Sequence, residues 1–238
     1  MKKLIFVKNF YRLIINRSKI KIIKKFLFYS FEYYKNKKQI IKYNNNQIKL
    51  LIKNKRVSEL WFSRNIYFLD KVLNKISQYN KKNILEIGSF EGVSSLYFLN
   101  KFKNCSLTCV DPFTGSDEHE KHKNNYNLEE NFDYNLIDYR DRYKKIKKYS
   151  YDFFKSNEDK YDLIYIDGSH RFEDVYGDAV QSNKFLNSNG LLIFDDFFWT
   201  FYEERLNPMA AINKFLKKFN NNYEVVYLSQ QLILRKKS

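Results

Sequence analysis

The chain alternates between short apolar runs and segments whose apolar residues recur every three or four positions. The short runs have the length of strands, and the longer segments have the periodicity of helices. The predicted strands cover residues 83–87, 106–110, 143–148, 161–166 and 191–194. The predicted helices of this region cover residues 58–76, 94–102, 128–137, 150–154, 172–186 and 208–219. Strands that alternate with helices form a parallel sheet with helices on both faces, so the pattern predicts an α/β fold.

The C-terminal residues depart from this alternation. Two apolar runs, 223–228 and 232–234, are separated only by residues 229–231. So short a connection joins antiparallel strands, because a parallel crossover needs a dozen or more residues. The complete pattern therefore predicts a three-layer Rossmann-like sandwich, in which a seven-stranded, mostly parallel sheet includes an antiparallel C-terminal hairpin strand.

Residues 1–57 differ from the rest of the chain. Apolar and basic residues alternate in short clusters, which predicts one or two basic amphipathic helices that end at a break around residues 44–46. The longest uncharged run, residues 26–31, is far shorter than the roughly 20 residues that span a bilayer. These helices could lie on an anionic membrane surface, bind an acidic polymer or pack on the body. The expected organisation is a basic helical extension, 1–57, followed by the main domain, 58–238.

Charge is divided in the same way. The net charge is +16, yet residues 1–60 hold 17 Lys or Arg against Glu32 and Glu59, so the remainder is nearly neutral. A nearly neutral main domain argues against a protein that grips nucleic acid with that domain. Two cysteines, Cys105 and Cys109, share one face of a predicted strand, which favours buried thiols in a reducing compartment. We therefore expect a cytoplasmic protein, and the basic helices allow attachment to the inner face of a membrane.

The first predicted strand leads into the sequence NILEIGSFEG, residues 83–92. Glu86 lies near the end of that strand, and Gly88 and Gly92 follow before the helical pattern resumes. Glycine lets the backbone turn sharply and lets a ligand approach, while the next helix offers free N–H groups. Asp111 ends the neighbouring strand, where an acidic side chain can accept hydrogen bonds from ribose hydroxyls. An ordinary strand-to-helix turn and a turn-forming Asp-Pro pair explain the same residues equally well.

Three aspartates and a histidine follow the ends of two later strands, namely Asp167, Asp195, Asp196 and His170. In open parallel sheets, ligands bind outside the carboxyl ends of the strands, so these side chains are expected to converge. Three carboxylates without a counter-ion would repel one another, and one hard divalent cation such as Mg²⁺ would remove that conflict. His170 would then serve as a general base. Strand-end caps for the aspartates and a helix cap for the histidine stay open as alternatives.

These motifs resemble the class I S-adenosylmethionine-dependent methyltransferases. More narrowly, they resemble the metal-dependent O-methyltransferases that include the macrocin and mycinamicin sugar enzymes, and the resemblance covers about residues 61–236. ILEIGSFEG is similar to the first cofactor motif of this branch, with Phe90 in place of the middle glycine. YDLIYIDGSHRFEDV and LLIFDDF together are similar to its most diagnostic pair of motifs.

The resemblance implies that six residues bind S-adenosylmethionine. They are Glu86, Gly88, Ser89 and Gly92 at the methionine end, Asp111 at the ribose and Ser150 at the adenine. The glycine that the family usually places before this serine is replaced here by Lys148 or Tyr149.

The resemblance also implies the metal ligands and the base. Asp167, Asp195 and Asp196 match the ligands of Mg²⁺ or another divalent cation, and His170 matches the base of the sugar methyltransferases. Related catechol-type enzymes use a lysine near this place, so His170 favours a sugar or glycan-like hydroxyl as acceptor. The expected reaction is direct displacement of the methyl group by that hydroxyl, from which His170 removes a proton.

Other functions stay open. A dehydrogenase that binds NAD needs the sequence GxGxxG, and Phe90 and Glu91 break that spacing. A ribose O-methyltransferase or nucleic-acid binder would use the basic extension, and a membrane-peripheral enzyme would act on a lipid-linked glycan. The acceptor pocket is expected between residues 113–142 and 197–205, where an aromatic wall can form. The sequence does not predict the oligomeric state.

Overall fold

A computed structural model describes the chain except residues 1, 76–81 and 116–126. Its centre is a seven-stranded sheet with the strand order β3-β2-β1-β4-β5-β7-β6. The parallel strands are β1 (Lys82–Ile87), β2 (Cys105–Val110), β3 (Tyr143–Ile146), β4 (Tyr161–Ile166) and β5 (Leu186–Phe194). The C-terminal strands β6 (Tyr223–Leu228) and β7 (Leu232–Lys236) form a hairpin, and β7 pairs antiparallel with β5. The predicted fold class is confirmed.

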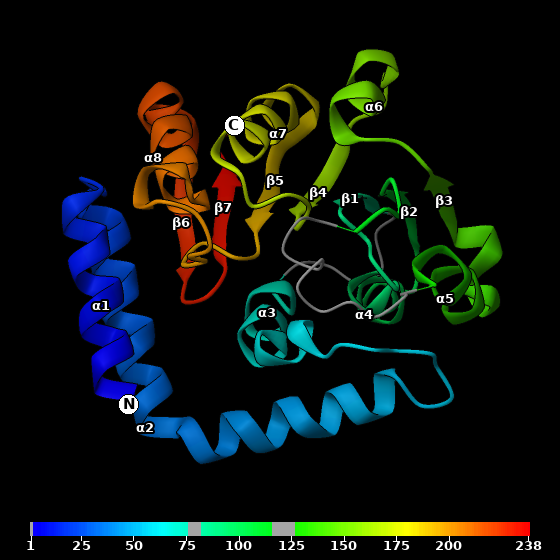
Figure 1. Cartoon of the computed structure of the whole chain (residues 1–238), viewed down its shortest axis with the longest axis horizontal. Coiled ribbons are helices and arrows are strands. Elements are labelled where there is room, and N and C mark those ends of the chain that lie inside the picture. The colour runs from blue at the N-terminus through cyan, green and yellow to red at the C-terminus, as the bar shows by residue number, and fades with distance from the viewer. Residues whose placement is uncertain (1, 76–81, 116–126) are drawn as a thin grey trace.

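Helices cover both faces of the sheet (Figure 1). One hydrophobic core forms under α6 (Ser150–Ser156), α7 (Phe172–Phe185) and α8 (Pro208–Lys218). The opposite core forms under α3 (Ile66–Leu73), α4 (Val93–Lys101) and α5 (Leu128–Asn135). Short 3₁₀ turns cover Trp61–Arg64 (η1), Ile137–Arg142 (η2), Glu204–Leu206 (η3) and Asn220–Asn222 (η4). This three-layer arrangement leaves the carboxyl ends of the parallel strands as one shared edge.

Two N-terminal helices, α1 (Lys2–Ile15) and α2 (Ile20–Leu51), precede this domain. α2 bends at Asn36 and passes the edge of the sheet at β6, so its first half joins one core and its second half the other. At the crossing, the ring of Tyr29 lies 4.6 Å from that of Tyr227, and the Tyr29 hydroxyl donates to the Val226 carbonyl at 3.2 Å. α2 therefore covers the edge strand, which would otherwise expose unpaired backbone groups. Among the described residues, no helix combines the length and the apolar character needed to cross a bilayer.

The structure corrects the predicted break at residues 44–46. Asn44 lies inside α2 and is buried, and its amide donates to the Arg64 carbonyl at 3.0 Å while its side-chain oxygen accepts from the Tyr67 N–H at 2.8 Å. Asparagine usually disfavours helix interiors because its side chain competes for backbone groups. Here the competing bonds go to another segment, so the helix continues.

Two further boundaries differ from the prediction. The first part of the predicted helix 58–76 is irregular or 3₁₀, and the α-helix begins only at Ile66. β5 begins at Leu186 rather than at residue 191, because the strand continues through Asn189 and Gly190 with an irregular register opposite β4. Asn189 reaches the left-handed region, with φ of 62°, so the backbone is kinked inside the strand.

Candidate active site

In the turn between β1 and α4, the backbone of Gly88 lies very close to the backbone of Asp167. Gly88 has φ of +85°, and a Cβ atom there would lie 2.2 Å from the carbonyl oxygen of Asp167. Only glycine fits at this point, because both the dihedral and the space exclude a side chain. Phe90 also lies in the left-handed region, with φ of 49°, although it stands where the family motif has glycine. Its ring is 5.3 Å from that of Trp61, so an aromatic pair flanks the turn.

Glu86 is fully buried beneath this turn. Its Oε2 atom accepts hydrogen bonds from the hydroxyls of Ser89, at 2.9 Å, and Ser95. Burial raises the pKa of the carboxyl group, and the neighbouring hydroxyls oppose that rise. Its Oε1 atom is buried with no hydrogen-bond partner among the described residues. A buried acceptor without a donor is costly, so this atom is suited to receive a donor from a ligand.

Asp111 follows β2 and holds the same turn from the other side. Its Oδ2 atom accepts the N–H groups of Ser89 and Phe90, both at 2.8 Å, and its Oδ1 atom accepts the N–H of Phe113 at 2.6 Å. The carboxylate therefore fixes two loops at the carboxyl edge of the sheet. Its Oδ1 atom keeps a second lone pair, so the capacity to accept a hydrogen bond from a ribose hydroxyl is retained.

Ser150 is placed at the start of α6, after β3. Its hydroxyl hydrogen-bonds Asp178, a buried carboxyl group on α7. Burial raises the pKa of Asp178 to about 7, and the bond from Ser150 partly opposes the rise. The structure thus gives this serine a role in joining α6 to α7, and its adenine contact stays a prediction.

The structure brings together two of the predicted metal ligands, Asp167 and Asp196, and the predicted base, His170. One ligand atom each from Asp167, His170 and Asp196 lies within 4.8 Å of the others. His170 Nε2 is 3.3 Å from Asp196 Oδ2 and 4.0 Å from Asp167 Oδ1. The three side chains are partly exposed, at 18% for the histidine, 30% for Asp196 and 27% for Asp167, although the Nε2 atom of the histidine is itself buried between the carboxylates. Carboxylate and imidazole are suitable donors for a divalent cation.

Asp195 is adjacent to this group but differs from it in burial and bonding. Its side chain lies inside the protein, and its Oδ1 atom accepts the side-chain amides of Asn65, at 3.0 Å, and Gln231. Both amides are buried and come from distant segments, the start of α3 and the β6–β7 turn. The sequence analysis missed these two residues, and a polar residue within the apolar pattern of 58–76 was the only signal for Asn65.

The three aspartates lie close enough to act on one another electrostatically. The pKa of Asp167 is well above its ordinary value because of burial and the neighbouring Asp195 and Asp196 carboxylates. Burial and Asp196 raise the pKa of Asp195 to about 7, although the bond from Gln231 opposes the rise. Like charges at this spacing disfavour full ionisation unless a cation compensates them.

Some of the aromatic residues after β5 lie beside the candidate site, and others are part of the hydrophobic core. The Trp199 ring is 5.2 Å from that of His170 and 37% of the tryptophan is exposed. Phe198 is buried and packs against Phe26 of α2, with ring centroids 5.3 Å apart. The Arg171 guanidinium lies 5.5 Å from the ring of Tyr202. The other half of the expected acceptor pocket includes residues 116–126, which lie outside the described part of the chain.

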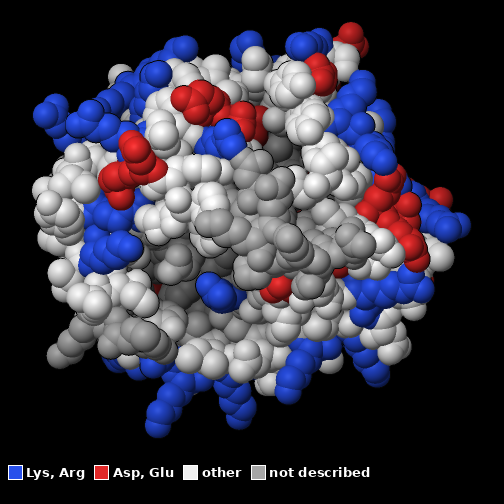
Figure 2. All heavy atoms as spheres, viewed as in Figure 1, with Lys and Arg blue, Asp and Glu red and all other residues white. Residues whose placement is uncertain are grey.

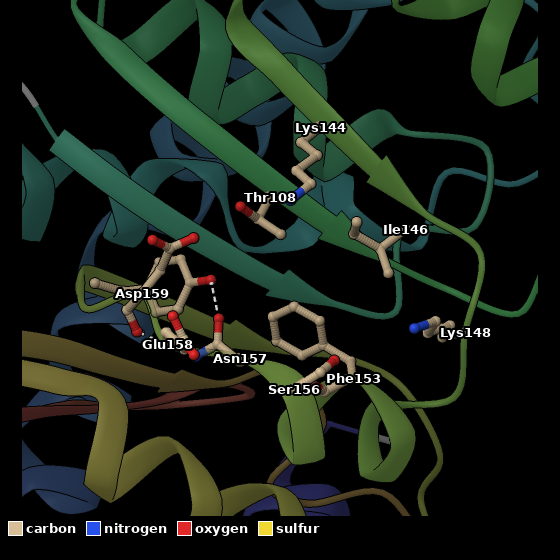
Figure 3. A pocket seen from close by; sticks show the side chains of 10 residues that line it. Thr108, Lys144, Ile146, Lys148, Phe153, Ser156, Asn157, Glu158 and Asp159 are labelled. Atoms are coloured by element: carbon tan, nitrogen blue, oxygen red, sulfur yellow. Dashed lines mark hydrogen bonds between the residues drawn. The ribbon is translucent and has the colours of Figure 1, made fainter.

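Two other cavities lie away from these residues. One of about 320 Å³ lies below α6, beside β2 and β3, and its walls include Thr108, Lys144, Phe153 and Asn157 (Figure 3). A second, of about 250 Å³, lies at the opposite ends of the strands and includes Lys82 and Asp162. The lining of neither cavity includes a predicted site residue. The chemistry of this chain therefore gathers at the carboxyl edge and not in these cavities.

Comparison with known proteins agrees with the resemblance to methyltransferases that the sequence motifs show. Residues 85–197 match a family described as "Methyltransferase domain". An uncharacterized protein of Acanthamoeba polyphaga mimivirus is 28% identical over 172 residues, which cover 68% of this chain and 73% of that protein.

Solved structures share the fold. A Staphylococcus aureus protein described as a candidate caffeoyl-CoA O-methyltransferase is 17% identical with a TM-score of 0.57, covering 85% of this chain and 99% of that one. The Bacillus cereus O-methyltransferase in complex with SAH is 14% identical with a TM-score of 0.55, covering 84% and 90%. MycE from the mycinamycin biosynthetic pathway, in complex with Mg, SAH and mycinamycin VI, is 14% identical with a TM-score of 0.55, covering 80% and 54%.

These structures establish the fold and the family match establishes the kind of domain that residues 85–197 form. Residues 85–197 therefore match a methyltransferase domain, within a fold that solved O-methyltransferases share. In this fold the antiparallel strand β7 lies between β5 and β6.

Proposed function

We propose that the chain is an O-methyltransferase that uses a divalent cation and methylates a hydroxyl of a sugar or glycan-like acceptor. The observation that carries this proposal is the position of His170 Nε2, 3.3 Å from Asp196 and 4.0 Å from Asp167, at the carboxyl edge of the sheet. A base and two carboxylates at one point fit the deprotonation of an alcohol. S-adenosylmethionine is the co-substrate, and its bond from sulfur to methyl breaks as the bond to the acceptor oxygen forms.

The turn after β1 fits the methionine end of this co-substrate. The orphaned Oε1 atom of Glu86 is suited to accept a hydrogen bond from its amino group. Gly88, Ser89 and Gly92 keep the backbone of the turn close to the ligand, and Asp111 is suited to bind the ribose. Ser150 is the proposed adenine contact, and it would have to share its hydroxyl with Asp178.

The acidic group fits a divalent cation, because without one the neighbouring carboxylates raise the pKa values of Asp167 and Asp195. Asp167 and Asp196 are the proposed direct ligands. Asp195 is the third proposed ligand, held in place by Asn65 and Gln231. When bound, Mg²⁺ or a similar ion would orient the acceptor hydroxyls and lower the pKa of the attacking one. The presence of Mg in the MycE complex supports this part of the proposal.

His170 is the proposed general base, and it accepts the proton of the acceptor hydroxyl at Nε2. The Asp196 carboxylate is close enough to stabilise the imidazolium that results. Trp199 lies against the imidazole ring and offers an apolar surface of the kind on which a sugar ring packs. The complex of MycE with mycinamycin VI also supports such an acceptor, because the motifs of this chain resemble those of the mycinamicin sugar enzymes.

The proposal is tested by a screen of nucleotide sugars and oligosaccharides with a labelled methyl donor, with Mg²⁺ and with excess chelator. We expect label in a sugar acceptor only when the cation is present, and recovery of the activity when the cation is restored. An acceptor that is methylated at an undiminished rate in excess chelator would refute the metal role. Methylation confined to RNA would refute the sugar acceptor.

A further inference from the structure

The N-terminal helices expose apolar side chains that the methyltransferase domain does not cover. α1 turns Phe6, Phe10 and Leu13 toward the core. Four of its other apolar residues recur at a spacing of three and four and are exposed, namely Leu4 at 71%, Val7 at 59%, Tyr11 at 63% and Ile14 at 50%. This spacing gives α1 a second apolar face, which is unusual for a helix on a protein surface.

The adjoining half of α2 repeats this feature. Phe6 of α1 stacks on Phe26 of α2 at 5.3 Å, so the two helices form a hairpin, as Figure 1 shows. On the outside of this hairpin the exposed apolar residues of α2 are Ile20 at 66%, Leu27 at 43%, Phe28 at 62% and Phe31 at 72%. The hairpin thus presents large aliphatic and aromatic side chains to solvent on both helices.

Basic residues accompany these apolar side chains. Lys8, Lys24 and Lys35 are exposed within about one turn of them, and none of the three forms a salt bridge with another described residue. The only acidic residue of positions 1–51 is Glu32, which is ion-paired with Lys71 of α3. Basic side chains also project along the lower edge of the molecule, where Figure 1 places the second half of α2 (Figure 2).

We propose that the α1–α2 hairpin docks the enzyme on an anionic lipid surface. A bilayer interface accepts apolar side chains at the acyl boundary and attracts lysines to the headgroups, so it satisfies both features together. Nucleic acid would pair with the lysines and leave the exposed aliphatic residues in water. A second copy of the same hairpin would bring two strongly basic segments together, and their repulsion disfavours it.

The test uses the full chain and sedimentation with vesicles of phosphatidylcholine, alone or with about 30% phosphatidylserine. Wild type should sediment with the anionic vesicles at low salt and be released at about 1 M salt, where charges are screened. The double variant Val7→Glu, Phe31→Glu should bind about tenfold more weakly, because both side chains would enter the acyl boundary. Ile137→Glu, on the exposed face of η2, is the matched control and should bind as wild type does.

A second pair of variants tests the charge separately. Lys24→Glu with Lys35→Glu should weaken binding to anionic vesicles, and Lys103→Glu, on the exposed loop before β2, should not. The proposal is overturned if wild type stays in the supernatant, or if neutral and anionic vesicles bind it equally. It is also overturned if the hairpin variants abolish a self-association without any effect on vesicle binding. Binding of SAH, measured on the same samples, reports the methyltransferase domain independently of this result.

A second inference comes from the contacts of α1 with the loop after β5. Arg12 is 2% exposed, and its Nε atom donates to both carboxylate oxygens of Glu204 at 2.9 Å, while its Nη1 atom donates to the Phe198 carbonyl at 2.8 Å. Asn16 adds a bond to Glu204 at 2.8 Å. A buried guanidinium with these partners fixes the loop firmly, because charge-assisted bonds are stronger than neutral ones.

We infer that Arg12 is a positioning residue for Trp199, which follows Phe198 and packs on His170. This inference rests on the proposed function, since it places the acceptor wall under the control of the N-terminal extension. In a Trp61→Phe background, which leaves Trp199 as the single tryptophan, Arg12→Gln should increase acrylamide quenching of its fluorescence about twofold or more, while the exposed neighbour Tyr11→Ala should not. Arg12→Lys should restore part of the protection, because lysine keeps the charge and loses the paired geometry.

Unchanged quenching in Arg12→Gln, with SAH binding retained, would refute this role. Loss of SAH binding as well would show that Arg12 supports the whole domain, and it would equally overturn the inference. Because the fluorescence needs no acceptor, the result is independent of whether the proposed acceptor class is correct.

Discussion

The two halves of the candidate site are built in different ways. On the cofactor side, Glu86 and Asp111 are held by serine hydroxyls and backbone N–H groups, so their geometry is already fixed by the protein. On the proposed acceptor side, Asp167 and Asp196 lie beside His170, and the neighbouring carboxylates raise the pKa of Asp167. The protein's own groups already hold the first half in place, whereas the proposed function assigns a cation to the second half.

The difference also concerns which parts of the chain supply each half. The cofactor side comes from β1, β2 and the turn between β1 and α4. The acceptor side additionally depends on Asn65 and Gln231, which hold Asp195, and on Arg12 of α1, which holds the loop of Trp199. Binding of the co-substrate and use of the acceptor should therefore respond to different substitutions.

The largest effect is expected for His170→Ala. Removal of the proposed base should lower turnover by about 10²–10⁴-fold while SAH binding stays within a factor of about two, since the imidazole lies on the acceptor side only. Turnover with labelled donor and SAH affinity by calorimetry measure the two quantities. Equal loss of both would contradict the separation of the two halves.

Asp167→Asn should affect the cation more than the co-substrate. The loss of one of the carboxylates should weaken the binding of Mn²⁺, used as a stand-in for Mg²⁺, by about tenfold or more, because the remaining ligands carry less charge. His170→Gln provides the comparison: if His170 is the base it should keep Mn²⁺ affinity, and if it is a ligand it should lose it as Asp167→Asn does. Titration of Mn²⁺ by calorimetry distinguishes these results.

Gly88→Ala should affect the junction where the two halves meet. The added Cβ would lie 2.2 Å from the Asp167 carbonyl oxygen at a φ of +85°, so we expect a destabilisation of about 2–3 kcal/mol together with weaker SAH binding. Thermal unfolding with and without SAH measures both effects. Gly177→Ala, on the open face of α7 where nothing lies within 4 Å of the added atom, is the control and should be neutral or stabilising.

The smallest effect on the reaction is expected for Asp178→Asn. Burial raises the pKa of Asp178 to about 7 in the folded chain from an ordinary value of 3.8, so the folded state binds the proton more tightly than the unfolded state. The stability that this group contributes is complete below about pH 4 and falls as the pH rises toward and through 7, by at most about 4 kcal/mol. The wild type should therefore lose more in Tm between pH 5 and 8 than the variant does. The exposed Asp174→Asn on the same helix is the control, and an identical pH slope in all three proteins would refute the assignment.

The sequence predicted the order of the strands and helices better than it predicted where they begin and end. Strand and helix order followed from periodicity, because apolar residues must face a core whatever the details of packing. The boundaries at Asn44, Ile66 and Leu186 did not follow from it. At Asn44, the long-range bonds to Arg64 and Tyr67 override the local preference.

By itself, the sequence determined the succession of strands and helices, the turn after β1 and the convergence of Asp167, His170 and Asp196, because the ends of adjacent parallel strands share one edge. Only the tertiary structure decided that Asp195 is held by Asn65 and Gln231, that Ser150 bonds Asp178, and that Arg12 reaches the loop of Trp199. The reason is physical: periodicity and motif spacing fix the faces and ends of local elements. The partner of a buried polar group, by contrast, depends on which distant segments the fold brings within about 3 Å.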